Sequence, residues 1–599
     1  MATSNSPAEQ LITENIDIWT SAIKKRGSQG RGSNKKFELH GIKKLRELIL
    51  ELAVRGLLVP QDPSDEPASV LLEKIAAEKE QLIKEKVIRN AKLAEENEMP
   101  SVKFDVPRGW KLPLLNDLIL NSSDDIVDGP FGSKLKASEY VDEGIPIIRI
   151  QNIGRNVFKD NGLQYLTEEK AASLSRHAFN AGDVVLNKLG EPTGKVCIVP
   201  DAISQGIIVA DIIRIRLNEE YHDKQYIVHC MNSPIVAYQF SGLAKGVTRQ
   251  RVNLSQVRSL KVPLPPLKEQ RRIVGRVDEL MALCDQLEQQ TESSLLAHQT
   301  LVETLLNTLL NADQNSFDQA WERIAQHFDV LFTTEHSIDQ LKQTILQLAV
   351  MGKLVPQDPN DEPASVLLEK IAAEKEQLIK DKVIKKQKVL SPVEVDEELF
   401  KLPTGWAWSR IGEFSLIGPR NLLDDDLEVS FVPMPLISTS YKGDHEQEVR
   451  LWSELKKGYT HFANGDIGLA KITPCFENSK ASIFSDLKNG FGAGTTELHI
   501  ARPLLEEINP LFVLLYLKAP MFLEVGKTKM TGSAGQKRIP KSFFEGNPFP
   551  LPPEAEQPRI VAKVDELMTL CDELKVRLQE AQETKLHLAD AMAEQALNS

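Results

Sequence analysis

Residues 190–196, GEPTGKV, have the composition of a phosphate-binding loop but not its spacing. That loop, G-x-x-x-x-G-K-[ST], needs one more spacer residue and a hydroxyl after the lysine to hold magnesium. The chain also lacks a G-x-G-x-x-G loop for adenosylmethionine, an H-E-x-x-H zinc helix and a G-x-S-x-G elbow. We therefore predict that this chain has no catalytic residue.

Two sets of charged residues could form a metal-dependent nuclease cluster, namely Asp183, Glu191 and Lys195, and Asp466, Glu477 and Lys480. Turn capping and solvent exposure explain these side chains more simply. The five cysteines are scattered and never spaced C-x-x-C. We therefore expect reduced, structural thiols and no metal site.

Basic and amide side chains in Gly-rich or strand-end segments could instead contact nucleic acid. Arginine suits guanine edges, Asn and Gln suit adenine, and lysine most often meets phosphate. In the first half the candidates are Lys134, Lys136, Arg149, Gln151, Asn152, Arg155, Lys188, Arg249, Gln250 and Arg251. In the second half they are Lys471, Asn478, Lys480, Lys527, Lys529, Gln536, Lys537 and Arg538. For each residue alone, an ordinary solvated side chain is the simpler interpretation.

The net charge of −13 is unfavourable for such contacts, but its distribution is not. Residues 105–262 contain 19 basic and 18 acidic side chains, and residues 402–550 contain 16 and 17. The acidic excess therefore lies outside these two blocks. Nearly neutral blocks with local clusters of basic residues can bind nucleic acid, whereas the acidic remainder is not expected to follow a phosphate backbone.

An internal duplication organises the chain. Residues 45–88 recur as residues 341–384, an offset of 296, with 8 mismatches in 44 positions. After a divergent block, residues 264–287 match residues 551–574 at an offset of 287. So long a period indicates duplicated domains, and each half reads helical arm, variable block, helical arm. Residues 24–36, KKRGSQGRGSNKK, occur only in the first half and are expected to be a flexible linker.

The arms have the pattern of long amphipathic helices. Residues 267–311 could form one helix of about 65 Å, and residues 60–69 are expected to end one helix and cap the next. Apolar or small residues recur in the 4-3-4-3 spacing of a coiled-coil seam. The predicted subunit-interface residues are Ile273, Val277, Leu280, Cys284 and Leu287, with Ile560, Val564, Leu567, Cys571 and Leu574. The alternative is that the arms are ordinary amphipathic core helices.

The two variable blocks contain strand-rich segments separated by turns. Residues 144–153 and 209–217 are rich in Ile. Both blocks contain G-D-x-x-L-x-K, at residues 182–188 and 465–471, which predicts a turn into a strand that delivers a lysine. Both blocks also end in a basic loop, so a common fold is expected despite the divergence.

We predict an α+β fold with two globular α/β domains, separated by conserved antiparallel coiled-coil helical arms, and an internal pseudo-twofold repeat. The predicted segments are 1–40, helical with a basic linker; 41–104, helical arm; 105–265, first domain; 266–400, long helix and second arm copy; 401–553, second domain; and 554–599, a C-terminal coiled-coil helix.

This layout resembles the specificity subunits of type I restriction-modification enzymes over nearly all of the chain. The specific elements are residues 129–153 and 465–481, the LPPLKEQ and LPPEAEQ starts of the long helices, and the order of arms and blocks. The resemblance implies that each block is a target-recognition domain for one half of a bipartite, asymmetric site on double-stranded DNA. The arms would bind two modification subunits and set the spacer. Two blocks related by pseudo-twofold symmetry can face major grooves about 34 Å apart.

The resemblance also implies that this chain holds no cofactor. Adenosylmethionine, ATP and magnesium are expected on modification and restriction subunits, which would methylate adenines and cleave DNA. The N-terminus lacks a secretory pattern, and no apolar run is long enough to span a membrane, so we expect a cytoplasmic protein with no membrane partner. Two alternatives stay open: a self-contained restriction-methylation enzyme, and a scaffold that does not bind DNA.

If the arms set the spacer, inserting about one helical turn near residues 291–294 should change the spacer length and leave both half-sites intact. Mapping of methylated adenines in cells that carry the variant measures both quantities. Unchanged spacing would contradict this role of the arms.

Overall fold

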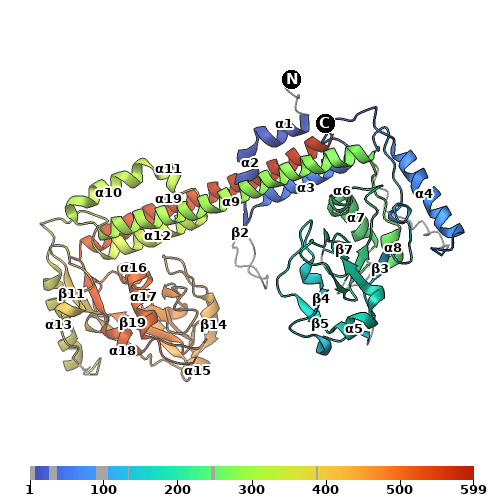
Figure 1. Cartoon of the computed structure of the whole chain (residues 1–599). Coiled ribbons are helices and arrows are strands. Elements are labelled where there is room, and N and C mark those ends of the chain that lie inside the picture. The colour runs from blue at the N-terminus through green and yellow to red at the C-terminus, as the bar shows by residue number, and fades with distance from the viewer. Residues whose placement is uncertain are drawn as a thin grey trace. The chain divides into compact units, whose positions relative to one another are not determined.

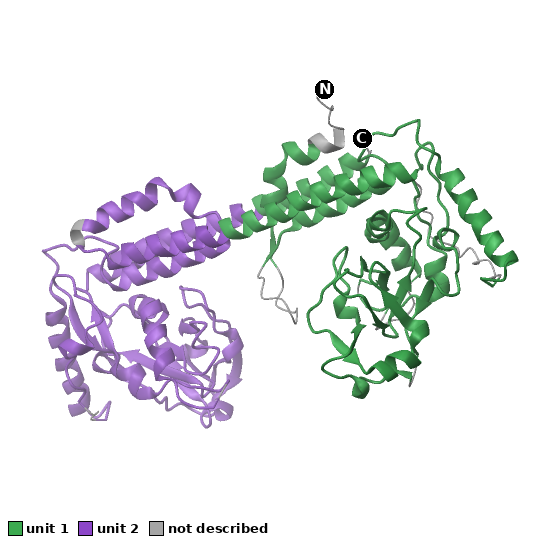
Figure 2. Cartoon of the chain, in the orientation of Figure 1, with its two compact units in different colours: residues 1–294, 581–599 green, residues 295–580 purple. Residues whose placement is uncertain are grey.

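The computed structural model describes residues 7–25, 37–89, 105–131, 134–190, 192–243, 250–385, 389–533 and 535–598. The chain divides into two compact units, Met1–Ser294 with Ala581–Ser599, and Leu295–Glu580 (Figure 2). Each unit contains a sheet-rich domain and a set of helices (Figure 1). The predicted combination of two α/β domains with a long helix is confirmed.

Unit 1 begins with the helices of the first repeat copy, which are α1 (Pro7–Glu14), α2 (Ile16–Ser21), α3 (His40–Arg55) and α4 (Ala68–Lys84). The short strands β1 (Lys24–Lys25) and β2 (Phe37–Glu38) pair with each other. The predicted linker therefore contributes its first two residues to a strand, and residues 26–36 lie outside the described residues.

The turn between α3 and α4 differs from the predicted turn where α4 begins. Helix α3 ends at Gly56, whose φ of 71° is left-handed. The N-cap of α4 is Pro67, and no side chain caps this helix. The carboxylate of Asp62 instead accepts a hydrogen bond from the amide of Ser64 at 2.9 Å, inside the turn. The expected capping of α4 by a turn side chain is therefore wrong.

The domain of unit 1 contains two four-stranded sheets. One sheet, in the order β3-β10-β7-β8, is antiparallel, and the other, β5-β4-β9-β6, contains the parallel pair β4 and β9. The strands are β3 (Ile126–Asp128), β4 (Ile145–Ile148), β5 (Gln164–Leu166), β6 (Ala178–Asn180), β7 (Val184–Asn187), β8 (Val196–Ile198), β9 (Gln205–Ile208) and β10 (Ile212–Ile215). The α-helices are α5 (Glu168–Ser173), α6 (Lys224–Asn232), α7 (Pro234–Leu243) and α8 (Leu254–Arg258).

The domain of unit 2 has the same sheet plan. Its sheets have the orders β12-β19-β16-β17 and β14-β13-β18-β15, the second with the parallel pair β13 and β18. The strands are β12 (Ser415–Ile417), β13 (Glu428–Val432), β14 (Glu448–Leu451), β15 (Thr460–Ala463), β16 (Ile467–Ala470), β17 (Ala481–Ile483), β18 (Phe491–Gly494) and β19 (Leu498–Pro503), and β11 (Ala407–Arg410) pairs with β20 (Pro548–Leu551). The expected common fold of the two divergent blocks is confirmed.

The helices of unit 2 likewise repeat those of unit 1. They are α10 (Gln314–Gln326), α11 (Phe328–Leu331), α12 (Glu335–Val350), α13 (Ala364–Lys380), α14 (Ile411–Phe414), α15 (Trp452–Leu455), α16 (Pro510–Lys518), α17 (Pro520–Lys529) and α18 (Lys541–Gly546). Helix α13 has the same 17-residue sequence as α4.

The two long helices are unbroken. Helix α9 (Leu267–Asn311) spans 45 residues, as predicted, and α19 (Glu556–Asn598) spans 43. Within unit 2, α19 runs antiparallel to α12, as three side-chain contacts show: Gln579 with Glu335, Lys575 with Asp339, and Lys342 with Asp572. In unit 1, Arg46 of α3 and Asp285 of α9 form the pair equivalent to the last of these.

The predicted coiled-coil seam lies inside this chain. In unit 1 the five seam residues of α9 are buried in one core with α3 and the end of α19. In unit 2, Ile560, Val564 and Cys571 are buried, and Leu567 and Leu574 half-buried, in a core shared with α12. The eight buried side chains pack against the chain's own helices and are therefore not available to another subunit, whereas Leu567 and Leu574 keep exposed area. The buried side chains hold the chain's own helices together.

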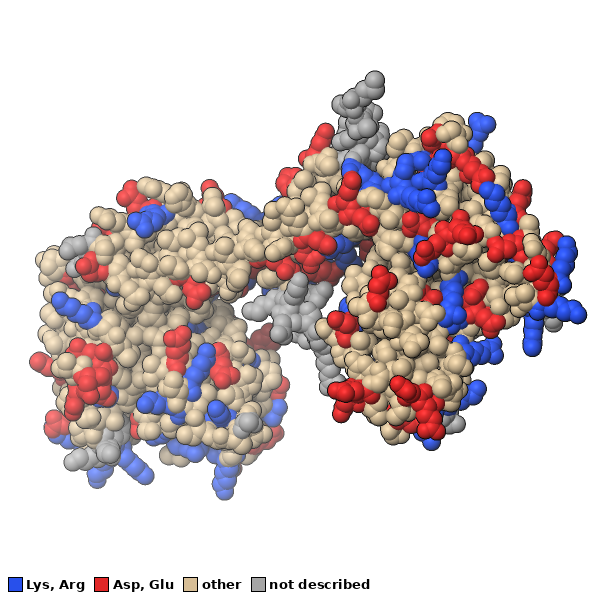
Figure 3. Space-filling view, in the orientation of Figure 1, with Lys and Arg blue, Asp and Glu red and all other residues tan. Residues whose placement is uncertain are grey.

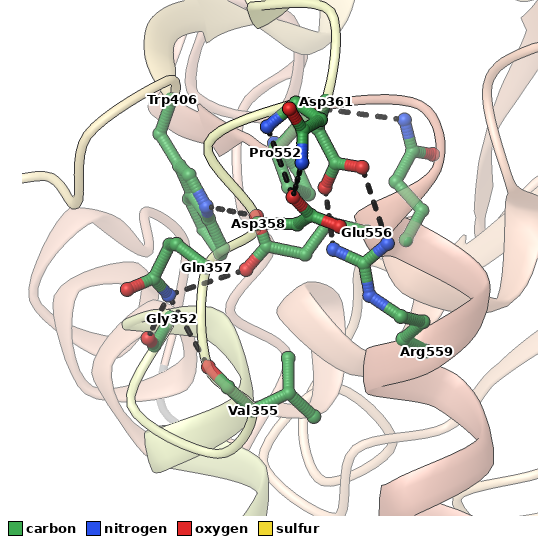
Figure 4. A network of polar contacts seen from close by, with 11 residues as sticks. Gly352, Val355, Gln357, Asp358, Asp361, Trp406, Pro552, Glu556 and Arg559 are labelled. Atoms are coloured by element: carbon green, nitrogen blue, oxygen red, sulfur yellow. Dashed lines mark hydrogen bonds and ion pairs between the residues drawn. The ribbon is translucent and has the colours of Figure 1, made fainter.

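A buried polar network joins the domain of unit 2 to the start of α19 (Figure 4). Glu556, which has no exposed area, accepts hydrogen bonds from Nε1 of Trp406 at 3.0 Å and from Nε2 of Gln357 at 3.3 Å. Burial raises the pKa of Glu556, and these two bonds oppose the shift. Arg559, one turn later, pairs with Asp361. The turn after α12, the entry to the domain and helix α19 are thus tied together.

Unit 1 contains the equivalent joint. Arg272 of α9 pairs with Asp65 at 2.8 Å, and the side chain of Asp65 is only 2% exposed. Burial raises the pKa of Glu269, which stands where unit 2 has Glu556. The indole Nε1 of Trp110 has no hydrogen-bond partner, so unit 1 repeats the ion pair but not the bond between Trp and Glu. The ion pair between Arg and Asp therefore connects each domain to its own long helix.

Gly352, which follows α12, is expected to tolerate no side chain. Its φ is 67°, and an added Cβ would lie 2.5 Å from Cγ of Pro403 and 2.8 Å from the Trp406 ring. Gly352→Ala should lower the free energy of unfolding of unit 2 by about 2–3 kcal/mol, which combines left-handed strain with the contact. Urea denaturation followed by tryptophan fluorescence measures the shift.

Gly458 offers the matched control, because its φ is 81° and nothing lies within 4 Å of an added Cβ. Gly458→Ala should cost only the backbone strain, about 1 kcal/mol. Equal shifts for the two variants would contradict the importance of the contact at Gly352.

Candidate nucleic-acid interface

In unit 1, several chemically capable side chains meet at one end of the sheet β3-β10-β7-β8. Strands β3 and β7 both run antiparallel to β10, so their last residues lie beside its first ones: Asp128 pairs with Ile213, and Asn187 with Ile212. The lysine of G-D-x-x-L-x-K, Lys188, comes directly after β7. The predicted turn, strand and lysine are therefore confirmed.

The basic loop at the end of the domain is attached to this same sheet end. The amide of Val252 donates to the carbonyl of Lys188 at 3.0 Å, and the amide of Gly190 donates to the carbonyl of Gln250 at 3.2 Å. Arg251 forms an isolated β-bridge with Leu189. Backbone hydrogen bonds thus hold two segments, about 60 residues apart in the sequence, side by side.

Unit 2 builds the same frame with different residues. The amide of Ile539 donates to the carbonyl of Lys471 at 2.9 Å, and Arg538 forms a bridge with Ile472. The amide of Lys471 donates to the carbonyl of Glu497 at 2.9 Å, as that of Lys188 does to Asp211. The backbone of this edge is therefore common to both domains.

Each basic loop contains an arginine paired with a carboxylate. Arg251 binds Asp211 in unit 1, and Arg538 binds Glu497 in unit 2 through two hydrogen bonds of 2.8 and 2.9 Å. The bond from Arg538 holds the pKa of Glu497 below its ordinary value. Sequence reasoning missed both carboxylates, although each occupies the same place just before the strand β10 or β19. These pairs hold the guanidinium groups in place at the edge.

Lys188 does not present its ammonium to solvent. Its side chain is 2% exposed, with Nζ 3.2 Å from Asp128 and 4.2 Å from the ring centre of Phe131. Burial lowers the pKa of Lys188, and Asp128 opposes this shift. Lys471, at the same place in unit 2, is half-buried. As a side chain that could touch a ligand, Lys188 is therefore less suitable than its sequence position indicated.

The other candidates of unit 1 lie on the connections around β4. Lys134 and Lys136 are exposed after β3, and Gln151 and Arg155 are exposed after β4. Asn152 is fully buried, where its Nδ2 donates to the carbonyl of Lys159 at 2.8 Å, so this amide shapes the loop. Arg149 donates to the carbonyl of Gly162 at 2.6 Å. Arg249 lies outside the described residues.

Most candidates of unit 2 are exposed. The exposed ones are Asn478, Lys527, Lys529, Gln536 and Lys537. Lys480 is half-buried, and its Nζ donates to the carbonyl of Met434 at 2.9 Å. Lys480 thus stabilises the loop before β17. Of the candidates in unit 2, the structure brings four together at the sheet edge, namely Lys471, Gln536, Lys537 and Arg538.

Two of the carboxylates that could form a nuclease cluster, Asp466 and Asp183, have structural partners, and Glu477 is exposed. Asp466, 1% exposed, accepts two hydrogen bonds of 2.8 Å from Arg502 and one of 2.7 Å from the amide of Ala463. Asp183 pairs with Arg216 in the same way. Glu191 lies outside the described residues. Across the part of the chain that the structure describes, no three His, Cys, Asp or Glu residues are grouped so as to hold a metal ion.

All five cysteines are free thiols. On the face drawn in Figure 3, basic and acidic side chains are interspersed among neutral ones in both units. Within the described ranges, no helix has the length and apolar character needed to cross a membrane.

Comparisons with known proteins agree on one family. Residues 125–297 match the family model described as type I restriction modification DNA specificity domain. The chain is 39% identical to the type I restriction enzyme EcoEI specificity subunit of Escherichia coli, over 98% of this chain and 100% of that protein. It is 36% identical to the EcoAI specificity subunit of the same species, with the same coverage. A crystal structure of the HsdS subunit from Thermoanaerobacter tengcongensis covers 83% of this chain and 98% of its own, at 18% identity and a TM-score of 0.40.

Arg502→Met should destabilise unit 2 by about 3 kcal/mol, because it leaves the buried carboxylate of Asp466 without its cation. Burial already raises the pKa of Asp466, and Arg502 opposes this shift. The loss should therefore be smaller in acid, where a protonated Asp466 needs no cation. Urea denaturation at neutral and acid pH measures both effects.

Lys456→Met serves as the control, because its partner Asp425 is exposed. Its cost should stay below about 1 kcal/mol. A loss at Arg502 that is equally small, or that does not depend on pH, would contradict the structural role of this pair.

Proposed function

The chain belongs to the specificity subunits of type I restriction enzymes, and from that premise we propose how it divides the reading of DNA. Each sheet-rich domain is a target-recognition domain, and each reads one half of a bipartite, asymmetric site on double-stranded DNA. The domain of unit 1 reads one half-site and the domain of unit 2 reads the other.

One observation carries this proposal: the two domains build the same sheet edge from the same backbone bonds, but present different side chains on it. Lys537 of unit 2 takes the place of Gln250 of unit 1, beside an arginine that both edges share. A common frame with different hydrogen-bonding groups reads different bases, because recognition in the major groove depends on which donors and acceptors face each base pair. Unlike half-sites follow from this difference.

The chain reads the two half-sites as one part of a complex. Two modification subunits bind the outer faces of the helical parts, carry adenosylmethionine and methylate adenines. Restriction subunits add translocation and cleavage with ATP and magnesium. The complex acts on DNA in the cytoplasm, and this chain contributes sequence selection and spacing.

Exchange of residues 105–262 for the corresponding block of the EcoEI specificity subunit should change one half-site only. Exchange of residues 402–550 should change the other half-site and leave the first intact. Single-molecule sequencing of methylated adenines, in cells that express each chimera with its modification subunits, measures both half-sites and the spacer.

Two results would contradict the proposal. An unchanged DNA preference in both chimeras would assign this chain a scaffold role alone. A change in both half-sites after a single exchange would show that the domains do not read independently.

A further inference from the structure

Phe131 is an exposed aromatic side chain at the end of the sheet β3-β10-β7-β8. The charged residues Lys188 and Asp128 lie near it but leave its ring open to solvent. It is 53% exposed, although it lies only three residues after a strand whose apolar residues are buried. The turn that presents it is closely fixed: the amide of Gly129 donates to the carbonyl of Ile212 at 3.0 Å, and an added Cβ on Gly129 would lie 2.0 Å from the carbonyl oxygen of Val209. The ring is therefore presented by a closely packed turn.

An ion pair with a buried ammonium supports the ring from one side. Nζ of Lys188 lies 4.2 Å from the ring centre, and Asp128 neutralises this ammonium at 3.2 Å. The cation occupies one face of the ring. Phe131 therefore cannot be sandwiched between two bases, and it offers a ligand its remaining face and edge.

The side chains near the Phe131 ring indicate which chemical group of a ligand could bind there. Lys188 lies beside Arg251 and Gln250 of the basic loop through the backbone contacts given above. The guanidinium of Arg251 is paired with Asp211, but the side chain as a whole is still 47% exposed. An apolar ring between such polar groups matches a base-pair edge that carries a methyl group among donors and acceptors, which in the major groove is thymine.

The equivalent position in unit 2 has a different chemistry. There the strand β12 is also followed by Gly-Pro, and the next residue is Arg420, which is exposed. Its guanidinium makes one long hydrogen bond, 3.4 Å to the carbonyl of Tyr459. The first residue after Gly-Pro thus varies between the two domains while the turn is kept, as expected of a position that distinguishes two half-sites.

We infer that Phe131 is a base-reading residue of the domain of unit 1, and that it recognises an A·T pair by contact with the C5-methyl group of thymine in the major groove. This inference rests on the proposed function. Lys188 acts as a positioning residue, because its buried ammonium holds the ring, and Asp128 acts through Lys188.

The test uses the full chain in complex with its modification subunits and a pool of randomised double-stranded DNA. Wild type should select a split sequence with thymine at one position of one half-site. Phe131→Ala should lower that thymine preference about three- to tenfold, and Phe131→Leu should retain part of it, because an alkyl group also contacts a methyl. The other half-site should not change.

A second measurement separates direct contact from a structural effect. Replacing the selected thymine by deoxyuridine removes only the methyl group. Wild type should lose about as much affinity on this substitution as it loses by Phe131→Ala, and the Phe131→Ala variant should lose nothing further. The slope of binding against salt concentration should stay constant, since no phosphate contact is removed.

Two control variants complete the experiment. Phe37→Ala removes a phenylalanine of similar exposure, 45%, from strand β2 and should leave the preference unchanged. Arg420→Ala lies in the other domain and should not affect this base pair. Additive losses from deoxyuridine and Phe131→Ala, or an unchanged preference in Phe131→Ala, would overturn the inference. If wild type selects no split sequence, the proposed function fails together with it.

Discussion

A carboxylate without exposed area has to receive hydrogen bonds, and this requirement ties the domain of unit 2 to its long helix. Glu556 meets it through Trp406, at the entry to the domain, and Gln357, in the turn after α12. Arg559 and Asp361 add an ion pair one helical turn away. Because Arg272 and Asp65 repeat this ion pair in unit 1, each domain has a defined attachment to the helix that carries it.

Because each domain is attached to its long helix at a fixed place, the side chains at its sheet edge can vary between domains. The bonds around Lys188 and Lys471 keep the backbone of that edge the same in both domains, although most side chains there differ. Main-chain hydrogen bonds depend little on side-chain identity, so the contact residues can change without loss of the frame. The carboxylates beside Arg251 and Arg538 serve the same end, since they hold flexible guanidinium groups in place.

The candidate site was predictable in outline but not residue by residue. The repeated G-D-x-x-L-x-K motif located the two sheet edges correctly, because a turn followed by a strand is a local pattern. Residue type alone selected Asn152 and Lys188, which the structure buries, and overlooked Phe131, which it exposes. Exposure depends on neighbours such as Asp128 and Lys159 that local patterns do not identify. The seam residues of α9 show the same limit, since their spacing predicts a packed helix face but not which helix covers it.

The sequence by itself determined the duplication, the unbroken helix α9, the common fold of the two blocks and the family. These features follow from hydrophobic spacing and from residues repeated at a fixed offset, both of which are properties of the chain in one dimension. Only the tertiary structure decided that α3 and the end of α19 cover the seam of α9, and that the ring of Phe131 lies above the ammonium of Lys188. Both outcomes depend on contacts between segments far apart in the sequence, whose side chains compete for the same space and solvent.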